Sequence, residues 1–344
     1  MTSSPEFVLR RRKALSFGAA AAIAAVVPPA YAQSRPVTLK VATATINDVN
    51  HHWMTTFKAA VEARADGRIK VDLFPASQLG AIPRMVEGVA LGTIECFVTA
   101  TSFLTNLDTR FQVFDMPGVL DDTAHAVRVF SRPEVRSLVG GFGNGKGMVP
   151  LAMFMHSPQT VVARRPIQRI ADFQGLKIRV LSSPLQVEPL RKVGASPVPM
   201  PLSEVMPALQ NGAIDGVITA STVSSALKFY DAAKFQTELP QWPVVVVSVF
   251  NQNWLGRLPA DLRTIVQEEA AKAEGPTNAF GAGDIGAARE VWTRNGGQIV
   301  ALAANESATF AKTASETATS VLQQNAAAKE AFDRYAAAAL KAKD

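Results

Sequence analysis

An arginine inside a short apolar strand is the residue of this chain best suited to binding chemistry. Residues 176–180 read LKIRV, and their alternation predicts a strand that carries Lys177 and Arg179 on one face. Strands of an α/β protein are normally buried on both faces, and a buried guanidinium needs a partner. The partner of Arg179 is therefore either a carboxylate of this chain, such as Asp172 or Glu204, or a carboxylate from outside the protein.

Three further polar side chains lie at or beyond the ends of predicted strands. Thr99 and Thr219 each follow a short apolar strand, and Asn251 follows the apolar run 244–250. Groups beyond the carboxyl ends of parallel strands converge on one crevice, where the planar fork of an arginine can hold a carboxylate with two hydrogen bonds. These residues predict a site for an organic anion, although a turn cap is the simpler role for Asn251 on its own.

Other chemistries find less support in the sequence. The histidines His51, His52, His125 and His156 lack metal-ligand spacing with carboxylates or cysteine, so no metal is predicted. The glycine-rich residues 140–147 lack the spacing of a phosphate-binding loop, and no G-x-S-x-G motif is present. No cofactor and no catalytic residue are therefore predicted.

The elements that must hold the anion site alternate between strand and helix. A first parallel set is predicted from strands at 37–43, 69–74 and 93–98 with helices at 53–65 and 82–91 between them. A second set is predicted from strands at 176–180 and 214–218 with helices at 184–193 and 203–210. The apolar strand 148–155 stops at His156, and the apolar run 244–250 leads back, so the chain is expected to cross between two α/β domains.

The first 32 residues predict a secretory signal peptide. A basic stretch at 10–13 precedes the apolar run 15–27, and Ala30-Tyr31-Ala32 is a small-x-small cleavage site. The pair Arg11-Arg12 leaves both Sec and twin-arginine export open. The expected location is the periplasm, with cleavage near Ala32.

The composition fits an exported protein with a sizeable core. Removal of residues 1–32 lowers the formal net charge from +6 to +3, which is too weak to argue for nucleic acid as a partner. The single cysteine, Cys96, excludes an internal disulfide and is expected to be a core residue. A mature chain of about 310 residues is long enough to be held by its core alone, as two domains.

Motifs along nearly the whole mature chain resemble the periplasmic substrate-binding proteins of TRAP transporters. In the first half these motifs are FPASQLG at 74–80, EGVALGTI at 87–94 and DMP at 115–117. In the second half they are DFQGLKIRV at 172–180, GASP at 194–197, SEV at 203–205, ALQNGAIDG at 208–216, Lys234-Phe235, Asn251 with Trp254, and LPADL at 258–262. Each motif is weak alone, but their order and spacing together make the resemblance specific.

The resemblance implies a fold and a role. The expected fold class is α/β, with two α/β domains around a central ligand cleft, like a periplasmic binding protein, and with hinge strands and a long helix crossing both domains. Domain I is expected to comprise residues 33–156 plus 245–285, and domain II residues 157–244 plus 286–344. The implied role is an extracytoplasmic receptor, not an enzyme, that binds a small carboxylate and delivers it to the integral membrane subunits of a TRAP transporter. We expect a monomer.

The resemblance also implies roles for individual residues. Arg179 matches the family's carboxylate-binding arginine, and Asn251 matches a polar position that contacts the same carboxylate. Members that bind sialic acid carry a second arginine twenty residues earlier and an asparagine after the Asp-Gly motif, where this chain has Gln159 and Thr219. These neutral groups argue against sialic acid and suit hydroxyl or keto oxygens.

The expected ligand-binding residues are therefore Arg179, Asn251, Gln159, Thr219, Trp53 and Thr99. The expected ligand is a small monocarboxylate with an apolar, keto or hydroxyl group, and a dicarboxylate stays open if a lysine or the backbone supplies a second anion site. Trp53, Phe103 and Phe154 suit either an aromatic wall of the site or the core. Two other functions also stay open: an exported enzyme acting on organic acids, with His156, Glu204 and Asp215 as candidates, and a ligand-sensing partner of a membrane receptor.

Overall fold

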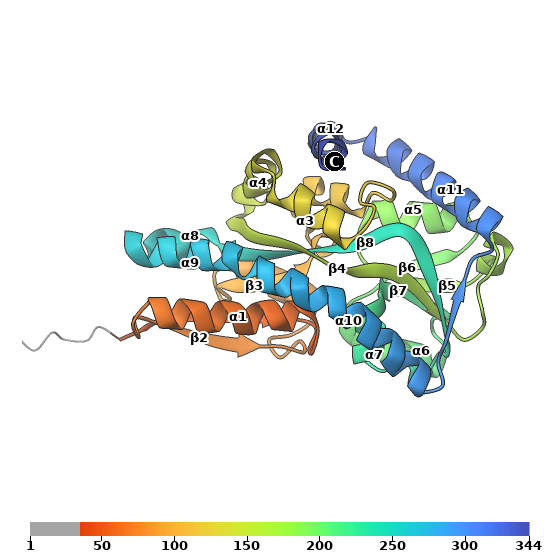
Figure 1. Cartoon of the computed structure of the whole chain (residues 1–344), viewed down its shortest axis with the longest axis horizontal. Coiled ribbons are helices and arrows are strands. Elements are labelled where there is room, and N and C mark those ends of the chain that lie inside the picture. The colour runs from red at the N-terminus through yellow and green to blue at the C-terminus, as the bar shows by residue number, and fades with distance from the viewer. Residues whose placement is uncertain (1–34, 344) are drawn as a thin grey trace, which may run out of the picture. The chain divides into compact units, whose positions relative to one another are not determined.

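The computed structural model describes residues 35–343, without the side chain of Pro240. The predicted signal peptide lies outside these described residues. Within them the chain forms a mixed α/β fold around a nine-stranded sheet with the order β2-β1-β3-β8-β4-β7-β5-β6, and β9 pairs with β8 (Figure 1). The predicted α/β class is confirmed.

Each end of the sheet is a parallel α/β set, as the sequence predicted. At one end β1 pairs in parallel with β2 and β3, and at the other end β5 pairs in parallel with β6 and β7. The elements of the first set are β1 (Val37–Thr43), α1 (Val49–Arg64), β2 (Ile69–Phe74), α2 (Ile82–Leu91) and β3 (Cys96–Ala100). The elements of the second set are β5 (Lys177–Val180), α5 (Pro184–Lys192), β6 (Ser196–Pro199), α6 (Val205–Asn211), β7 (Gly216–Ala220) and α7 (Ser221–Ala226).

Two long antiparallel strands join the two sets. β4 (Met148–Ala163) and β8 (Phe235–Asn251) pair with each other along most of their length (Figure 1). β8 also pairs with β3, and β4 also pairs with β7, so the two strands connect the parallel sets into one sheet. Their register shifts between Met155 and Pro158 and again between Pro158 and Thr160, which interrupts the regular ladder where the chain passes from one set to the other. Both strands are about twice as long as the sequence predicted.

A long helix runs beside both sets. α9 (Ala260–Lys272) ends just before α10 (Glu274–Arg294) begins, and Gly275 and Pro276 lie in the first turn of α10. α10 packs against α1 of the first set and α7 of the second, so the expected crossing helix is present (Figure 1). Gly281 permits the close packing on α1, because a Cβ atom there would lie 2.9 Å from Val49 Cγ1.

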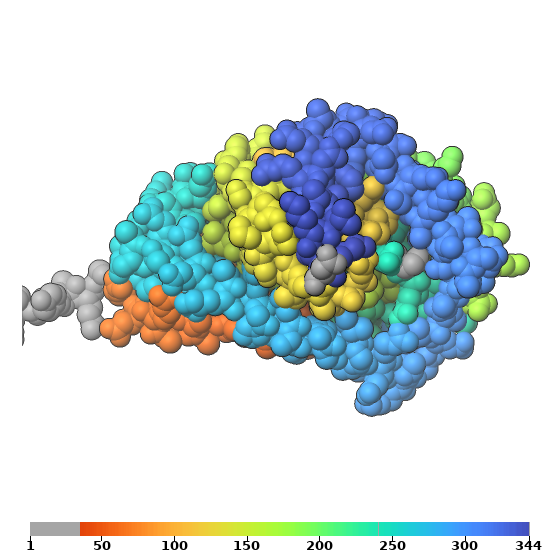
Figure 2. All heavy atoms as spheres, turned by 45° about the horizontal axis from the view of Figure 1, so that its top comes forward, coloured from red at the N-terminus to blue at the C-terminus, as the bar shows by residue number. Residues whose placement is uncertain are grey.

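Further helices cover the sheet and its connections. α12 packs against α3 and α4, and Figure 2 shows the C-terminal helices lying over this region. The predicted domain boundaries assign α12 to domain II but α3 and α4 to domain I; those boundaries remain a prediction. The remaining elements are α3 (Thr123–Ser131), α4 (Pro133–Gly140), α8 (Gln252–Arg257), β9 (Gln298–Ala301), α11 (Ala304–Leu322), α12 (Ala326–Lys341), and the 3-10 helices η1 (Thr101–Leu104), η2 (Thr109–Asp115), η3 (Asn144–Lys146), η4 (Ile170–Phe173), η5 (Leu202–Glu204) and η6 (Phe229–Asp231).

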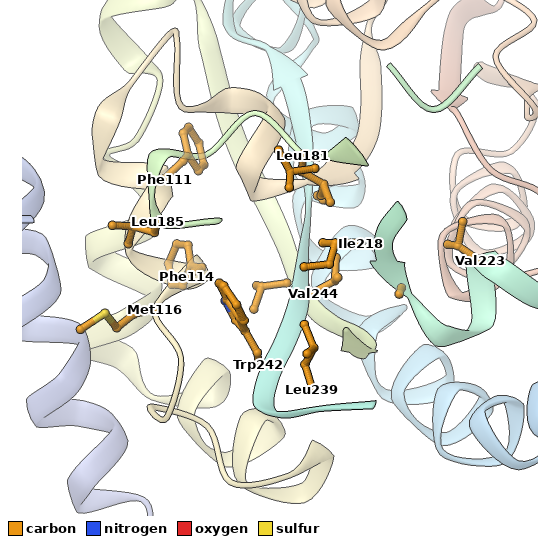
Figure 3. Packing of buried hydrophobic residues seen from close by; sticks show 14 of the residues in the cluster. Phe111, Phe114, Met116, Leu181, Leu185, Ile218, Val223, Leu239, Trp242 and Val244 are labelled. Atoms are coloured by element: carbon orange, nitrogen blue, oxygen red, sulfur yellow. The ribbon is translucent and has the colours of Figure 1, made fainter. Parts of the chain in front are cut away.

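Apolar side chains from both sets fill the core. Figure 3 shows Phe114 of η2, Trp242 and Val244 of β8, and Ile218 of β7 in the larger of two buried clusters. Cys96 is fully buried in the smaller cluster, which confirms its predicted role as a core residue. Within residues 35–343 no helix is long and apolar enough to cross a membrane.

Candidate ligand-binding site

A cavity lies where the carboxyl ends of both parallel sets meet. Thr43 of β1, Thr99 of β3 and Thr219 of β7 line it, and so do Arg179 of β5 and Val244 of β8. Parallel strands direct the groups at their carboxyl ends into a shared crevice, and here two such sets face one space. The complete lining is Thr43, Ala44, Thr45, Asn50, Ile82, Val98, Thr99, Ala100, Phe103, His156, Arg179, Leu181, Leu202, Thr219, Ala220, Val223 and Val244.

Arg179 is the buried cation of this cavity. Its side chain is 1% exposed, and its guanidinium donates from Nε to Met200 O at 2.9 Å and from Nη1 to Ile218 O at 3.1 Å. Its Nη2 is buried without a hydrogen-bond partner in the part of the chain that the structure describes. Burial without a counter-charge lowers the pKa of Arg179 to about 9, so the group is still a cation at neutral pH. Two backbone carbonyls thus orient the guanidinium and leave one nitrogen free for a ligand.

The internal partners considered for Arg179 lie elsewhere. Asp172 accepts hydrogen bonds from the backbone of Gln168 and Arg169, which hold the pKa of its carboxyl below the usual value. Glu204 is exposed at the end of η5. Among residues 35–343 no carboxylate forms a salt bridge with Arg179. The structural salt bridge is therefore not the role of this arginine.

Thr219 and Thr99 line the cavity as the strand ends predicted, and both are buried. Gln159 lies on β4 opposite Ala220 of β7, is fully buried, and is not in the cavity lining. Both polar atoms of its amide lack a partner among the described residues. A buried amide without hydrogen-bond partners raises the free energy of the folded state. Gln159 therefore requires a water or a ligand as its partner next to the site.

Asn251 and Trp53 lie outside the cavity. Asn251 caps α8: its Oδ1 accepts from Trp254 N at 2.7 Å, and its Nδ2 donates to Val89 O at 2.7 Å. It lies seven residues beyond the cavity-lining Val244, or about 23 Å along an extended strand. The turn cap was therefore the better interpretation of Asn251, and neither its position nor its bonds leave it free to contact a carboxylate beside Arg179.

Trp53 belongs to the core. Its indole Nε1 donates to Ala270 O at 3.1 Å, and its ring stacks on Phe57 with 4.8 Å between ring centroids. Phe154 lies in the same cluster. Of the three aromatic candidates, Phe103 alone lines the cavity, with the Arg179 guanidinium carbon 5.9 Å from its ring centroid.

Sequence reasoning missed Thr43, Thr45 and Asn50 of the cavity, and it named His156 only as a candidate for enzyme chemistry. Asn50 lies in the first turn of α1, and His156 lies on β4 where the apolar pattern stops. His156 Nε2 is 2.9 Å from Asp48 Oδ2, and its Nδ1 is 2.9 Å from Thr222 Oγ1. The signal for Asn50 was the helix start itself, since Asp48 at the N-cap accepts a hydrogen bond from His51 N and so begins α1 before residue 53.

Two carboxyl groups near His156 have pKa values shifted in opposite directions. Burial raises the pKa of Asp48, but hydrogen bonds and the charge of His156 outweigh this and leave the pKa below its ordinary value. Asp284 of α10 is half-buried, and burial raises its pKa to about 6 despite the nearby His156. Both ring nitrogens of His156 are engaged, so the histidine acts as a wall of the cavity and not as a free base.

The rest of the wall is apolar. Figure 3 shows three of these side chains, Leu181, Val223 and Val244. The others are Ala44, Ile82, Val98, Ala100, Phe103, Leu202 and Ala220. In the described part of the chain no group of three or more histidine, cysteine or carboxylate side chains is placed to hold a metal. The cavity thus combines one cation, several neutral hydrogen-bonding groups and a large apolar surface.

Comparison with known proteins agrees with this arrangement. The family model described as bacterial extracellular solute-binding protein, family 7, matches residues 41–325. The 2,3-diketo-L-gulonate-binding periplasmic protein YiaO of Escherichia coli (strain K12) is 32% identical over 189 residues, which are 55% of this chain and 57% of that protein. The C4-dicarboxylate-binding periplasmic protein DctP of Rhodobacter capsulatus is 26% identical over 65% of this chain and 67% of its own length.

Solved structures share the whole fold. A TRAP periplasmic solute-binding protein from Shewanella oneidensis with bound succinate has a TM-score of 0.82 and 25% identity, over 88% of this chain and 99% of its own. A TRAP periplasmic solute-binding protein from Desulfovibrio salexigens with bound orotic acid has a TM-score of 0.84 and 24% identity, over 89% of this chain and 99% of its own. With the match of the family model to most of its length, the chain belongs to the bacterial extracellular solute-binding protein family 7.

Proposed function

We propose that this protein is an extracytoplasmic receptor that binds a small organic acid and delivers it to the membrane subunits of a TRAP-type transporter. The observation that carries the proposal is Arg179 Nη2, a buried guanidinium nitrogen with no partner among residues 35–343. A ligand carboxylate supplies both the missing hydrogen bond and the missing counter-charge. The named ligands of related proteins, among them succinate and 2,3-diketo-L-gulonate, are organic acids and support this assignment.

The ligand class that fits best is a small monocarboxylate. Arg179 is the one arginine or lysine among the cavity-lining residues, and the other titratable side chain of the lining, His156, is paired with Asp48. A second carboxylate would be buried without a cation beside it, which is unfavourable. We assign Thr219 and Thr99 to neutral oxygens of the ligand, and Gln159 to a supporting position next to them.

Binding is coupled to closure of two domains in this proposal. The ligand enters while the domains, with the boundaries predicted above, are apart, and its carboxylate pairs with Arg179. Closure then buries the ligand by bending at the register shifts of β4 and β8, with α10 following both domains. Loss of water from the cavity strengthens the ion pair, because the local dielectric falls. The remaining proposals are a monomeric, periplasmic protein with no nucleic-acid partner.

The geometry favours a receptor over an enzyme. His156 has both ring nitrogens engaged by Asp48 and Thr222, and Glu204 is exposed away from the cavity. Asp215 accepts a hydrogen bond from Lys177 N at 2.8 Å and supports the start of β5. Each of the three candidates for acid–base chemistry is thus either hydrogen-bonded to other residues of the chain or exposed outside the cavity. A sensory role would use the same binding event with a different membrane partner.

Calorimetry on Arg179→Ala tests the proposal. Removal of one member of a buried charge pair costs about 2–5 kcal/mol, so affinity for any bound organic acid should fall by tens- to thousands-fold. The matched control is Arg191→Ala in α5, since that arginine is exposed and pairs with Glu188 on the surface. Unchanged affinity in Arg179→Ala, with Arg191→Ala also unchanged, would remove Arg179 from the site.

A further inference from the structure

A second unpartnered polar atom belongs to the cavity wall. Asn50 lines the cavity and is 5% exposed. Its Nδ2 donates to Thr45 Oγ1 at 3.1 Å and to Thr43 Oγ1 at 3.4 Å. Its Oδ1 is buried and has no hydrogen-bond partner anywhere in the described chain. Arg179 Nη2 is thus a donor without an acceptor, and Asn50 Oδ1 is an acceptor without a donor.

The surrounding hydroxyls decide which way the amide of Asn50 faces. Thr43 Oγ1 donates its single hydrogen to Val98 O at 2.9 Å. Its oxygen therefore offers a lone pair to Asn50, which places the NH2 group toward the hydroxyls. With the amide in this orientation, Thr45 Oγ1 accepts from Asn50 Nδ2 at 3.1 Å. The carbonyl oxygen is left as the atom that needs a partner.

The nearby cavity wall does not provide that partner. His156 uses one ring nitrogen on Asp48 and the other on Thr222. Ile82, Val98 and Ala100, which also line the cavity, have no side-chain donor. A buried carbonyl group is normally hydrogen-bonded, so a bound water or a donor group of the ligand meets Asn50 Oδ1.

We infer that Asn50 is a specificity-determining residue that selects organic acids carrying a hydroxyl or N–H donor in addition to the carboxylate. This inference rests on the proposed function, because Arg179 anchors the carboxylate and so sets the orientation in which the donor meets Asn50. A keto oxygen or a second carboxylate at the same place would face Asn50 Oδ1 with another hydrogen-bond acceptor, and two acceptors cannot form a hydrogen bond. A site that hydrogen-bonds a ligand hydroxyl rejects the analogue that lacks it, because the protein group is then left unpaired.

Calorimetry at pH 7 with eight named acids tests the inference. Four acids carry a donor: pantoate, L-galactonate, orotate and lactate. Four lack one: 3,3-dimethylbutanoate, succinate, pyruvate and propanoate. Lactate, pyruvate and propanoate share a three-carbon skeleton, as pantoate and 3,3-dimethylbutanoate share a branched one. The tightest ligand of the wild-type protein should be donor-bearing and should bind roughly ten- to hundred-fold more tightly than its counterpart without a donor.

The variant Asn50→Leu should reduce that ratio to less than about three-fold, mainly by weakening the donor-bearing acid. The ratio is measured within one preparation, so partial loss of folded protein does not alter it. Asn50→Ala repeats the measurement with less bulk, and Asn253→Leu, an exposed asparagine of α8, should leave the ratio unchanged.

The failures of the two proposals are distinguishable. If an acid without a donor binds most tightly, or if Asn50→Leu weakens both members of a pair equally, the inference about Asn50 is overturned while the receptor function stands. If none of the eight acids binds the wild-type protein, the proposed function and the inference that rests on it both fall.

Discussion

Two arginines of the molecule have opposite electrostatic surroundings. Glu274 at the start of α10 receives both terminal nitrogens of Arg136 from α4, one of them at 2.5 Å, and also accepts from Met153 N of β4 at 2.8 Å. Arg179, by contrast, has two backbone carbonyls and no carboxylate within the described residues. One arginine is neutralised inside the protein, whereas the other is left for a partner from outside.

The difference separates a structural charge from a binding charge. Arg136 and Glu274 satisfy each other and tie α4, β4 and α10 together at the point where α9 ends. Arg179 carries the same guanidinium group, but the two backbone carbonyls that fix its orientation do not neutralise its charge. An unmet buried charge is unfavourable in the empty protein and becomes favourable when a counter-ion binds, which is what a receptor requires.

The largest effect on stability is expected when the paired site is broken. Glu274→Ala leaves Met153 N and the partly exposed Arg136 without their acceptor, and loss of this buried partner should cost up to about 3 kcal/mol of unfolding free energy. Glu290→Ala on the same helix removes an exposed carboxylate 3.7 Å from Arg294 and should cost less than about 1 kcal/mol. Urea denaturation compares the two. Equal midpoints would show that the Arg136–Glu274 pair does not stabilise the fold.

Asp115 differs from both arginine sites, because it is a buried carboxylate with no cation beside it among the described residues. Its Oδ1 accepts from Ser102 Oγ at 2.5 Å and from Gln186 Nε2 at 3.0 Å, and its Oδ2 has no partner among residues 35–343. Burial raises its pKa from 3.8 to about 6. Between these two pKa values the folded protein keeps the proton of Asp115, whereas the unfolded chain releases it. The free energy of unfolding therefore falls as pH rises from about 4 to 6, by about 3 kcal/mol in all.

Asp115→Asn should remove this pH dependence. The unfolding free energy of the variant, relative to wild type, should grow by about 3 kcal/mol between pH 4 and pH 7, because asparagine has no charge to bury. Thermal or urea unfolding across that range measures the difference. Asp333→Asn, which changes an exposed carboxylate paired with Lys329, is the control. A difference that does not change with pH would place the pKa of Asp115 near its ordinary value.

The smallest stability change is expected at the unpaired site. Arg179→Met removes a buried charge but leaves Met200 O and Ile218 O without their donor, and these opposing terms should nearly offset. The unfolding free energy without ligand should change by less than about 1 kcal/mol while binding of organic acids is lost. A loss comparable with that of Glu274→Ala would instead make Arg179 a structural arginine, against the comparison drawn above.

Much of the fold followed from sequence patterns because both parallel sets are built from short, regularly alternating elements. The full lengths of β4 and β8 did not, since Gln159 of β4 and Gln236 and Thr237 of β8 are buried polar residues inside strands, and Pro158 of β4 is half-buried. Periodicity reports the solvent-facing pattern of a strand, and a strand paired on both sides and covered on both faces has none.

The binding site was predictable in part for a similar reason. Arg179, Thr99 and Thr219 stand out as polar groups at the ends of apolar strands. The N-cap Asp48 marks the helix start and so places Asn50 in the first turn of α1, but it does not distinguish a cavity-lining asparagine from a solvated one. Asn251 carried the opposite signal, since a polar residue after a strand can begin the next helix as well as contact a ligand.

The central position of β8 also bears on how the chain folds. β8 pairs with β3, almost 150 residues earlier, and with β4, some 90 residues earlier. β8 links β3 of the first set to β4, which pairs with β7 of the second set, so chains that lack residues 235–251 lack the contacts that complete the sheet. Such distant pairings slow folding, because the chain loses the entropy of the long intervening loop before the stabilising contacts form. A chain with this topology is therefore expected to stay unfolded for a long interval before the sheet is complete.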